Sequence, residues 1–185
     1  MSTGRLAARD AGANGARMKS LLALALPIYA LDQATKWWIV SRLSLSNEWP
    51  PIDPGAHMEV VPGWFHLVYW ANTGAAFSSF HNNNSAFILV GLIALVGIVI
   101  ATLRGVFPDR ASQVGVGLLV GGILGNVTDR FIHGHVVDFL LVDLHVRFAD
   151  PWPAFNVADS AICIAVAVFL LASLLAPKTT AQPVQ

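Results

Sequence analysis

The segment that decides the fold runs from Gly121 to Ser160 and reads GGILGNVTDRFIHGHVVDFLLVDLHVRFADPWPAFNVADS. It joins two long apolar runs through a short polar connection. Two of its carboxylates, Asp138 and Asp159, lie in apolar surroundings, in HVVDFLLV and FNVADSAICIA. A carboxylate beside lipid or protein core is costly unless it is protonated, paired or hydrogen-bonded. Any interpretation of the sequence has to account for two such carboxylates in one connection.

The composition indicates a membrane protein. Of the 185 residues, 55% are hydrophobic and only 12% are charged, whereas a soluble domain carries about 25% charge. The net charge is zero and no basic block is present, so nucleic acid is not expected as a partner. The single Cys163 and the absence of an HExxH motif exclude a disulfide framework and the common zinc sites, and we expect no metal or cofactor.

Apolar runs of sufficient length predict four transmembrane helices and an all-α polytopic membrane protein. Three runs lack any Asp, Glu, Lys or Arg, and each is about as long as a helix that crosses ~30 Å of hydrocarbon; they cover residues 86–103, 111–128 and 160–177. The first run, residues 20–42, is interrupted by Asp32 and Lys36. We predict that it is an uncleaved spanning helix.

The domain organisation follows from these helices. We expect residues 1–19 to form a disordered basic cytoplasmic arm, 20–177 the membrane domain, and 178–185 a cytoplasmic tail. Basic residues concentrate in the arm and the short turns, which by the positive-inside rule places both termini in the cytoplasm. The longer connections, 43–85 and 130–157, then lie on the outer face together with most of the acidic residues.

The first outer connection contains a predicted small β-rich cradle between the first two helices. After a proline-rich beginning, the sequence GWFHLVYW at residues 63–70 has the aromatic and β-branched character of strands. We expect this sheet to lie on or against the membrane surface.

Two polar groups precede the central segment. Asp32 and Lys36 are four residues apart on one helix face, which favours an ion pair tying the first helix to the bundle. The sequence NTGAAF begins at Asn72 and contains Gly74. It is equally consistent with a turn and with an amide that binds an extended peptide backbone beside small residues that leave room for it.

A second group, Asn126, Asp129 and Arg130, shares one face at the end of the third predicted helix. One interpretation is an Arg–Asp pair that ends the helix, where a cation is favourable. The other is that Arg130 holds a substrate carbonyl or anion while Asp129 fixes the guanidinium.

Asn156 and Asp159 are spaced as a capping box at the start of the fourth predicted helix. Capping does not explain Asp138, which lies in a strand-like apolar run. Two acids at one membrane face suggest a dyad in which one carboxylate is protonated while the other acts as a base on water. The alternatives are a non-catalytic assembly protein, in which capping explains the acids, and a proton relay.

Five blocks resemble, in order and topology, the bacterial lipoprotein signal peptidase (signal peptidase II) family. These are DQATK (32–36), NTGAAF (72–77), GNVTDR (125–130), VVDF (136–139) and FNVADS (155–160). The resemblance covers roughly residues 20–177.

The resemblance implies an inner-membrane aspartic endopeptidase that removes the signal peptide from diacylglyceryl-modified prolipoproteins, N-terminal to the lipobox cysteine. It implies further that globomycin-like cyclic peptides inhibit it, that membrane lipid surrounds it, and that it acts as a monomer with its site at the periplasmic face. The family's site positions fall on the catalytic pair Asp138 and Asp159, on the substrate-binding residues Asn72, Gly74, Asn126, Arg130 and Asn156, and on the supporting residues Asp32, Lys36 and Asp129.

Overall fold

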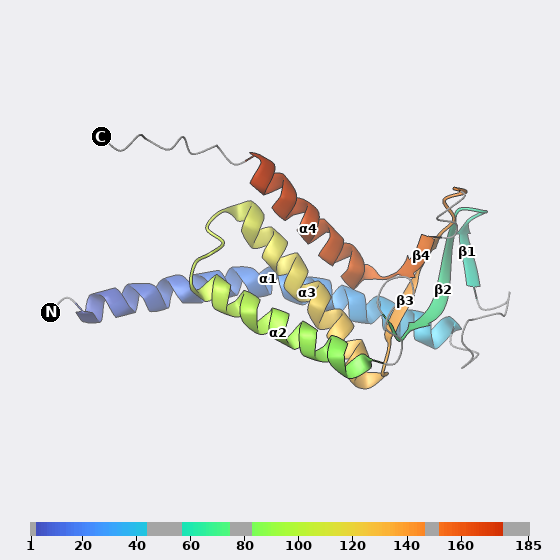
Figure 1. Ribbon diagram of the computed structural model, residues 1–185, viewed down its shortest axis with the longest axis horizontal. Coiled ribbons are helices and arrows are strands. Elements are labelled where there is room, and N and C mark those ends of the chain that lie inside the picture. The colour runs from blue at the N-terminus through green and yellow to red at the C-terminus, as the bar shows by residue number, and fades with distance from the viewer. Residues whose placement is uncertain (1–2, 44–56, 75–82, 147–151, 176–185) are drawn as a thin grey trace.

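The computed structural model describes residues 3–43, 57–74, 83–146 and 152–175, and they form a helical bundle with a small sheet at one end (Figure 1). The helices and strands, in chain order, are α1 (Thr3–Leu43), β1 (His57–Val61), β2 (Phe65–Asn72), α2 (Asn84–Leu103), α3 (Arg110–Ile132), β3 (Val136–Val142), β4 (Trp152–Phe155) and α4 (Val157–Leu175).

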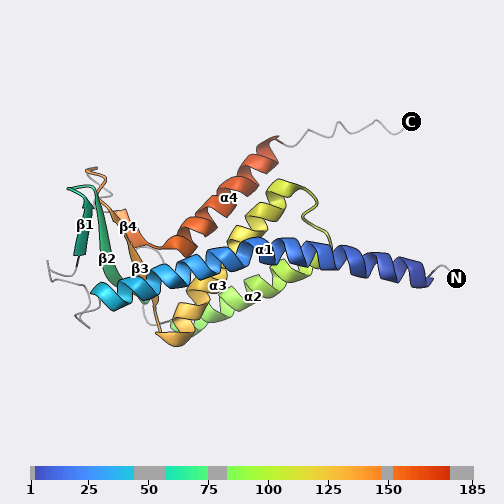
Figure 2. The same cartoon turned by 180° about the vertical axis from the view of Figure 1, so that it is seen from behind.

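Helix α1 is longer than the sequence analysis predicted. It is 41 residues long and begins at Thr3, so residues 3–19 continue the helix and are not the disordered arm that we expected. Alanine is frequent there and favours helix, Met18 packs against the apolar core, and Arg17 Nη1 donates to the Leu103 carbonyl at 3.2 Å. The N-terminal part of α1 projects beyond the other helices (Figures 1 and 2).

Three helices of the described chain, α2, α3 and α4, are long and apolar enough to cross a membrane. The four predicted helices are therefore present, while spanning by α1 remains a prediction. Helix α3 lies at the centre and contacts the other three. Glycines allow this close packing: a Cβ at Gly121 would lie 2.8 Å from the Ala25 carbonyl oxygen of α1, and one at Gly122 would lie 2.5 Å from that of Ala158 in α4.

The sheet draws its strands from the two long connections between the helices, residues 43–85 and 130–157. Its order is β1-β2-β3-β4 with antiparallel pairs, so the predicted cradle within residues 43–85 is only half of it. An isolated hairpin is marginally stable, and the apolar β3 pairs with β2 to extend it. In this register Trp70 lies opposite Asp138, and Asn72 lies opposite Val136.

Two apolar clusters form the core, and α1 contributes to both. One joins α1 to α3 around Leu21 and Val120. The other joins the end of α1 to the sheet around Ile39 and Val137. The segment of α1 between the clusters carries Asp32 and Lys36, which are 0% and 3% exposed. A buried polar layer therefore lies between the bundle and the sheet.

Candidate active site

Asp138 is held inside this layer by two amides. It lies on β3 and is 1% exposed. Asn72 Nδ2 donates to its Oδ2 at 2.9 Å, and Asn156 Nδ2 donates to its Oδ1 at 2.7 Å. The β2–β3 register makes Asn72 a diagonal cross-strand neighbour of Asp138. Burial, and then the nearby carboxylate of Asp159, raises the pKa of Asp138 to about 7.

Asp159 lies in the first turn of α4 and takes part in a reciprocal capping box with Asn156. The Asp159 amide donates to Asn156 Oδ1 at 2.8 Å, and the Asn156 amide donates to Asp159 Oδ2 at 3.2 Å. The predicted cap is thus confirmed. The cap does not exclude a role in the site, because Asn156 Nδ2 also contacts Asp138.

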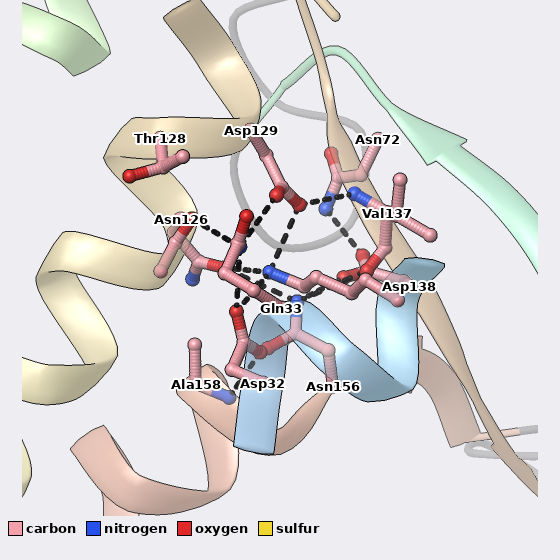
Figure 3. Close-up of polar contacts among 12 residues, drawn as sticks. Asp32, Gln33, Asn72, Asn126, Thr128, Asp129, Val137, Asp138, Asn156 and Ala158 are labelled. Atoms are coloured by element: carbon pink, nitrogen blue, oxygen red, sulfur yellow. Dashed lines mark hydrogen bonds and ion pairs between the residues drawn. The ribbon is translucent and has the colours of Figure 1, made fainter. Parts of the chain in front are cut away.

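Asn126 completes a chain of amides between the two aspartates. Its Nδ2 donates to Asp159 Oδ1 at 2.7 Å, while its Oδ1 accepts from Asn156 Nδ2 at 3.2 Å. Hydrogen bonds therefore run from Asp159 to Asn126, from Asn126 to Asn156, and from Asn156 to Asp138. The chain links α3, β3 and the start of α4; Figure 3 labels its members Asn126, Asn156 and Asp138.

A buried charge cluster centred on Lys36 contacts this chain of amides at Asn126. Its Nζ is 2.9 Å from Asp32 Oδ2, 2.9 Å from Asp129 Oδ2 and 3.0 Å from Asn126 Oδ1. The predicted Asp32–Lys36 ion pair is confirmed, and Lys36 also bridges α1 to α3 through Asp129. Breaking a buried pair of this kind typically costs about 3–5 kcal/mol because it leaves an uncompensated charge.

The two supporting carboxylates bind the backbone just before each candidate catalytic aspartate. Asp32 Oδ1 accepts from the Ala158 amide at 2.9 Å, one residue before Asp159. Asp129 Oδ2 accepts from the Val137 amide at 3.0 Å, one residue before Asp138. The same cluster therefore fixes the backbone at both aspartates (Figure 3).

Arg130 is arranged differently from the sequence hypothesis. Among the described residues, Asp129 contacts Lys36, Gln33 and the Val137 amide, so the expected Arg130–Asp129 pair is wrong. Arg130 Nη2 instead donates to the Gly74 carbonyl at 2.8 Å, and its guanidinium lies 4.4 Å from the centre of the Phe87 ring.

The turn expected at NTGAAF is present in its described part. The Gly74 amide donates to Asn72 Oδ1 at 3.0 Å, which leaves Asn72 Nδ2 directed at Asp138. The hypothesis that this segment binds a peptide backbone is not tested by these contacts. The remaining residues, 75–77, lie outside the described part of the chain.

A cavity of about 310 Å³ opens beside these groups. Its polar lining consists of Asn72, Asn126, Arg130 and Asp159. Its apolar wall comes from α2, α3, α4 and the start of β3, and includes Phe87, Val90, Ile123, Val127, Val136 and Ile162. A site with one polar and one apolar side suits an amphipathic ligand.

Two residues of the site, Gln33 and Asn84, were not predicted from the sequence. Gln33 Nε2 donates to Asp129 Oδ1 at 2.9 Å and to Asp32 Oδ2 at 3.1 Å, and Asn84 Oδ1 accepts from Arg130 Nη1 at 3.3 Å. An amide inside an apolar run was the available signal for Gln33.

No group of three His, Cys, Asp or Glu side chains in the described ranges is placed to hold a metal ion.

Comparisons with known proteins agree with this architecture. The chain is 43% identical over 141 residues to the lipoprotein signal peptidase of Thermosynechococcus vestitus, covering 76% of this chain and 82% of that one. It is 41% identical over 161 residues to that of Syntrophotalea carbinolica, covering 85% and 92%. A solved structure of a bacterial membrane enzyme superposes with a TM-score of 0.72 at 26% identity, covering 89% of this chain and 94% of that one.

The family model described as signal peptidase (SPase) II matches residues 24–175. That range contains the buried cluster, the amide chain and both aspartates. The chain therefore belongs to the signal peptidase II family and is a membrane protease that processes lipoproteins.

Proposed function

We propose that the protein is an aspartic endopeptidase that cleaves the signal peptide from diacylglyceryl-modified prolipoproteins, N-terminal to the lipobox cysteine, with Asp138 and Asp159 as a catalytic dyad. The observation that carries this proposal is the chain of two amides that joins the buried Asp138 to the partly buried Asp159, which lines a cavity. The relatives, which are lipoprotein signal peptidases, supply the lipoprotein substrate class.

The dyad provides the acid and the base that peptide hydrolysis needs. Two neighbouring carboxylates, one buried and one partly buried, share one proton because both cannot ionise together at low cost. The ionised member removes a proton from water as its oxygen attacks the scissile carbonyl, and the protonated member donates to the carbonyl oxygen. The resulting diol collapses by breaking the C–N bond, and the proton taken from water passes to the leaving amine. A pKa of about 7 at Asp138 suits proton transfer near neutral pH.

The remaining polar groups suit the orientation of an extended peptide. Asn72, Asn126 and Arg130 line the cavity, and amide and guanidinium donors bind backbone carbonyls. The apolar wall, which includes Val90 and Ile162, suits the apolar signal helix or acyl chains. Cyclic peptides of the globomycin type would compete for the same space.

The orientation in the membrane completes the proposal. Helix α1 acts as the fourth span because its 41 residues exceed the roughly 20 needed to cross the hydrocarbon. Both termini lie in the cytoplasm by the distribution of basic residues. The sheet and dyad then lie at the periplasmic face of the inner membrane, where a substrate held in the outer leaflet presents its scissile bond.

The test is cleavage of a diacylglyceryl-modified prolipoprotein by the purified protein in detergent. Mass spectrometry should locate the new N-terminus at the lipid-modified cysteine, and the unmodified precursor should be cut much more slowly. An assembly protein or a proton relay would cut neither substrate. Equal cleavage of both precursors would contradict the requirement for the lipid.

A further inference from the structure

We propose that Lys36 is a positioning residue for both aspartates, acting on Asp159 through the amide of Asn126 and on the two backbones through Asp32 and Asp129. This goes beyond a role in holding the fold, and it rests on the dyad proposed above. Two sets of contacts and the charge around the dyad support it.

The first contact determines which way the Asn126 amide points. Lys36 Nζ and Asn156 Nδ2 approach the same oxygen of Asn126, at 3.0 and 3.2 Å. Both are donors only, so this atom must be the carbonyl oxygen, and the Asn126 NH₂ must face Asp159. Without the ammonium group, one amide alone would hold this orientation. A rotated Asn126 would present its oxygen to the Asp159 carboxylate and repel it.

The second set of contacts reaches the backbone at both aspartates. Lys36 binds Asp32 and Asp129 at equal distances of 2.9 Å. These carboxylates in turn accept the amides of Ala158 and Val137, which immediately precede Asp159 and Asp138. The Lys36 ammonium group is therefore linked, through one carboxylate in each case, to the backbone amides that precede Asp159 and Asp138.

The third observation is the charge around the dyad. Burial first, and the Asp159 charge second, raise the pKa of Asp138, while the amides of Asn72 and Asn156 and the Lys36 charge oppose that rise. Every ion pair that joins this cluster, within the described residues, has Lys36 as its cation, and Arg130 is turned toward Gly74 and Asn84. The other titratable or charged groups around the cluster are Asp32 on α1, Asp129 and Arg130 on α3, His135 before β3, Asp138 on β3 and Asp159 on α4.

A test must separate positioning from simple support of the fold. Lys36→Met alone leaves two buried carboxylates without a cation and risks unfolding the protein. The double variant Asp32→Asn/Lys36→Met removes a cation and an anion together. Its matched control is Asp32→Asn alone. There the amide oxygen can still accept from Ala158, while the new NH₂ faces the Lys36 ammonium, so Lys36 keeps only its contacts with Asp129 and Asn126.

The measurement is kcat, KM and the pH profile of prolipoprotein cleavage for these two variants and the wild type. Relative to the Asp32→Asn control, the double variant should lose about 10- to 100-fold in kcat, the range expected for one hydrogen bond to a charged group. Its KM should change little, and its pH profile should move to higher pH because a nearby positive charge has gone. The same kcat and the same profile in both variants would overturn the proposal.

A second cycle tests whether the effect passes through Asn126. In an Asn126→Ala background, the removal of Lys36 should cost much less in kcat than it does when Asn126 is present. Equal losses in both backgrounds would contradict the route through that amide. If the double variant unfolds, Lys36→Arg keeps the charge but changes the donor geometry. It should lower kcat through the changed donor geometry while leaving the pH profile in place, because the charge is retained. An unaltered kcat would overturn the proposal.

Failure of this inference can be distinguished from failure of the proposed function. If the wild type does not cut the lipid-modified substrate, the proposed function is wrong. If the wild type cuts it and removal of Lys36 lowers only the resistance to unfolding, the dyad stands and Lys36 is structural.

Discussion

Asp138→Asn should stabilise the protein at alkaline pH while abolishing its activity. In the folded wild type, burial and Asp159 raise the pKa of Asp138 from 3.8 to about 7. The native state therefore retains a proton that the unfolded chain has released, and stability falls as pH rises from about 4 to 7, then levels off. At about 1.4 kcal/mol per pH unit, ionising Asp138 above pH 7 costs the native state about 4 kcal/mol.

The asparagine removes this cost but loses one hydrogen bond. Asn72 and Asn156 each donate to a different oxygen of Asp138, and an amide has only one oxygen to offer. An unsatisfied buried donor costs about 1–3 kcal/mol. The variant should therefore be more stable than the wild type by about 2 kcal/mol at pH 8, and less stable by about 1–3 kcal/mol near pH 4.

Equilibrium unfolding in mixed detergent micelles, followed by tryptophan fluorescence at several pH values, tests this difference. The stability of the wild type should decline between pH 4 and 7, whereas the slope due to Asp138 should be missing from the variant. The two curves should cross between these values. Parallel curves would refute the reasoning, because Asp138 would then titrate alike in the folded and unfolded states.

Three other substitutions test separate parts of the site. Asn156→Ser should retain most of the cap, whereas Asn156→Ala should lose about 1 kcal/mol more; both should lose activity, and a fully active serine variant would show that the amide is needed only for capping. Gly125→Ala places a Cβ against the Asp32 carboxylate and 3.2 Å from the Ala158 Cβ, so it should lower the unfolding midpoint and the cleavage rate together, and an unchanged midpoint would contradict this packing. Arg130→Lys should raise KM, since lysine cannot reproduce the planar contacts to Gly74 and Phe87; an unchanged KM would place Arg130 outside substrate binding.

The long apolar runs predicted the helices well because a span through lipid leaves a strong signal in the sequence. Runs such as residues 86–103 allow few alternatives, and α2 and α4 coincide with the predicted positions. The capping box at Asn156 and the ion pair at Asp32 were also predictable, because both depend on spacings of three or four residues within one helix.

The contacts between distant segments could not be predicted from local spacing. The pairing of β3 with β2 joins residues about 70 positions apart, and the alternation of the strands does not specify a partner. For the same reason Asp129 was assigned to its neighbour Arg130, although its partner is Lys36 on another helix. The extension of α1 to Thr3 was missed because a polar, glycine-containing segment has no apolar periodicity.

The most direct test of the account is the cleavage of lipid-modified prolipoprotein by Asp138→Asn and Asp159→Asn, each verified as folded in detergent. Asp143→Asn is the matched control, since this carboxylate follows the same strand but contacts His66 at 2.9 Å. Each dyad variant should lose about 10²–10⁴-fold in kcat, as expected for removal of a general acid or base, while the control should remain within about twofold of the wild type because Asp143 does not line the cavity. Substantial cleavage by either folded dyad variant would contradict the catalytic dyad.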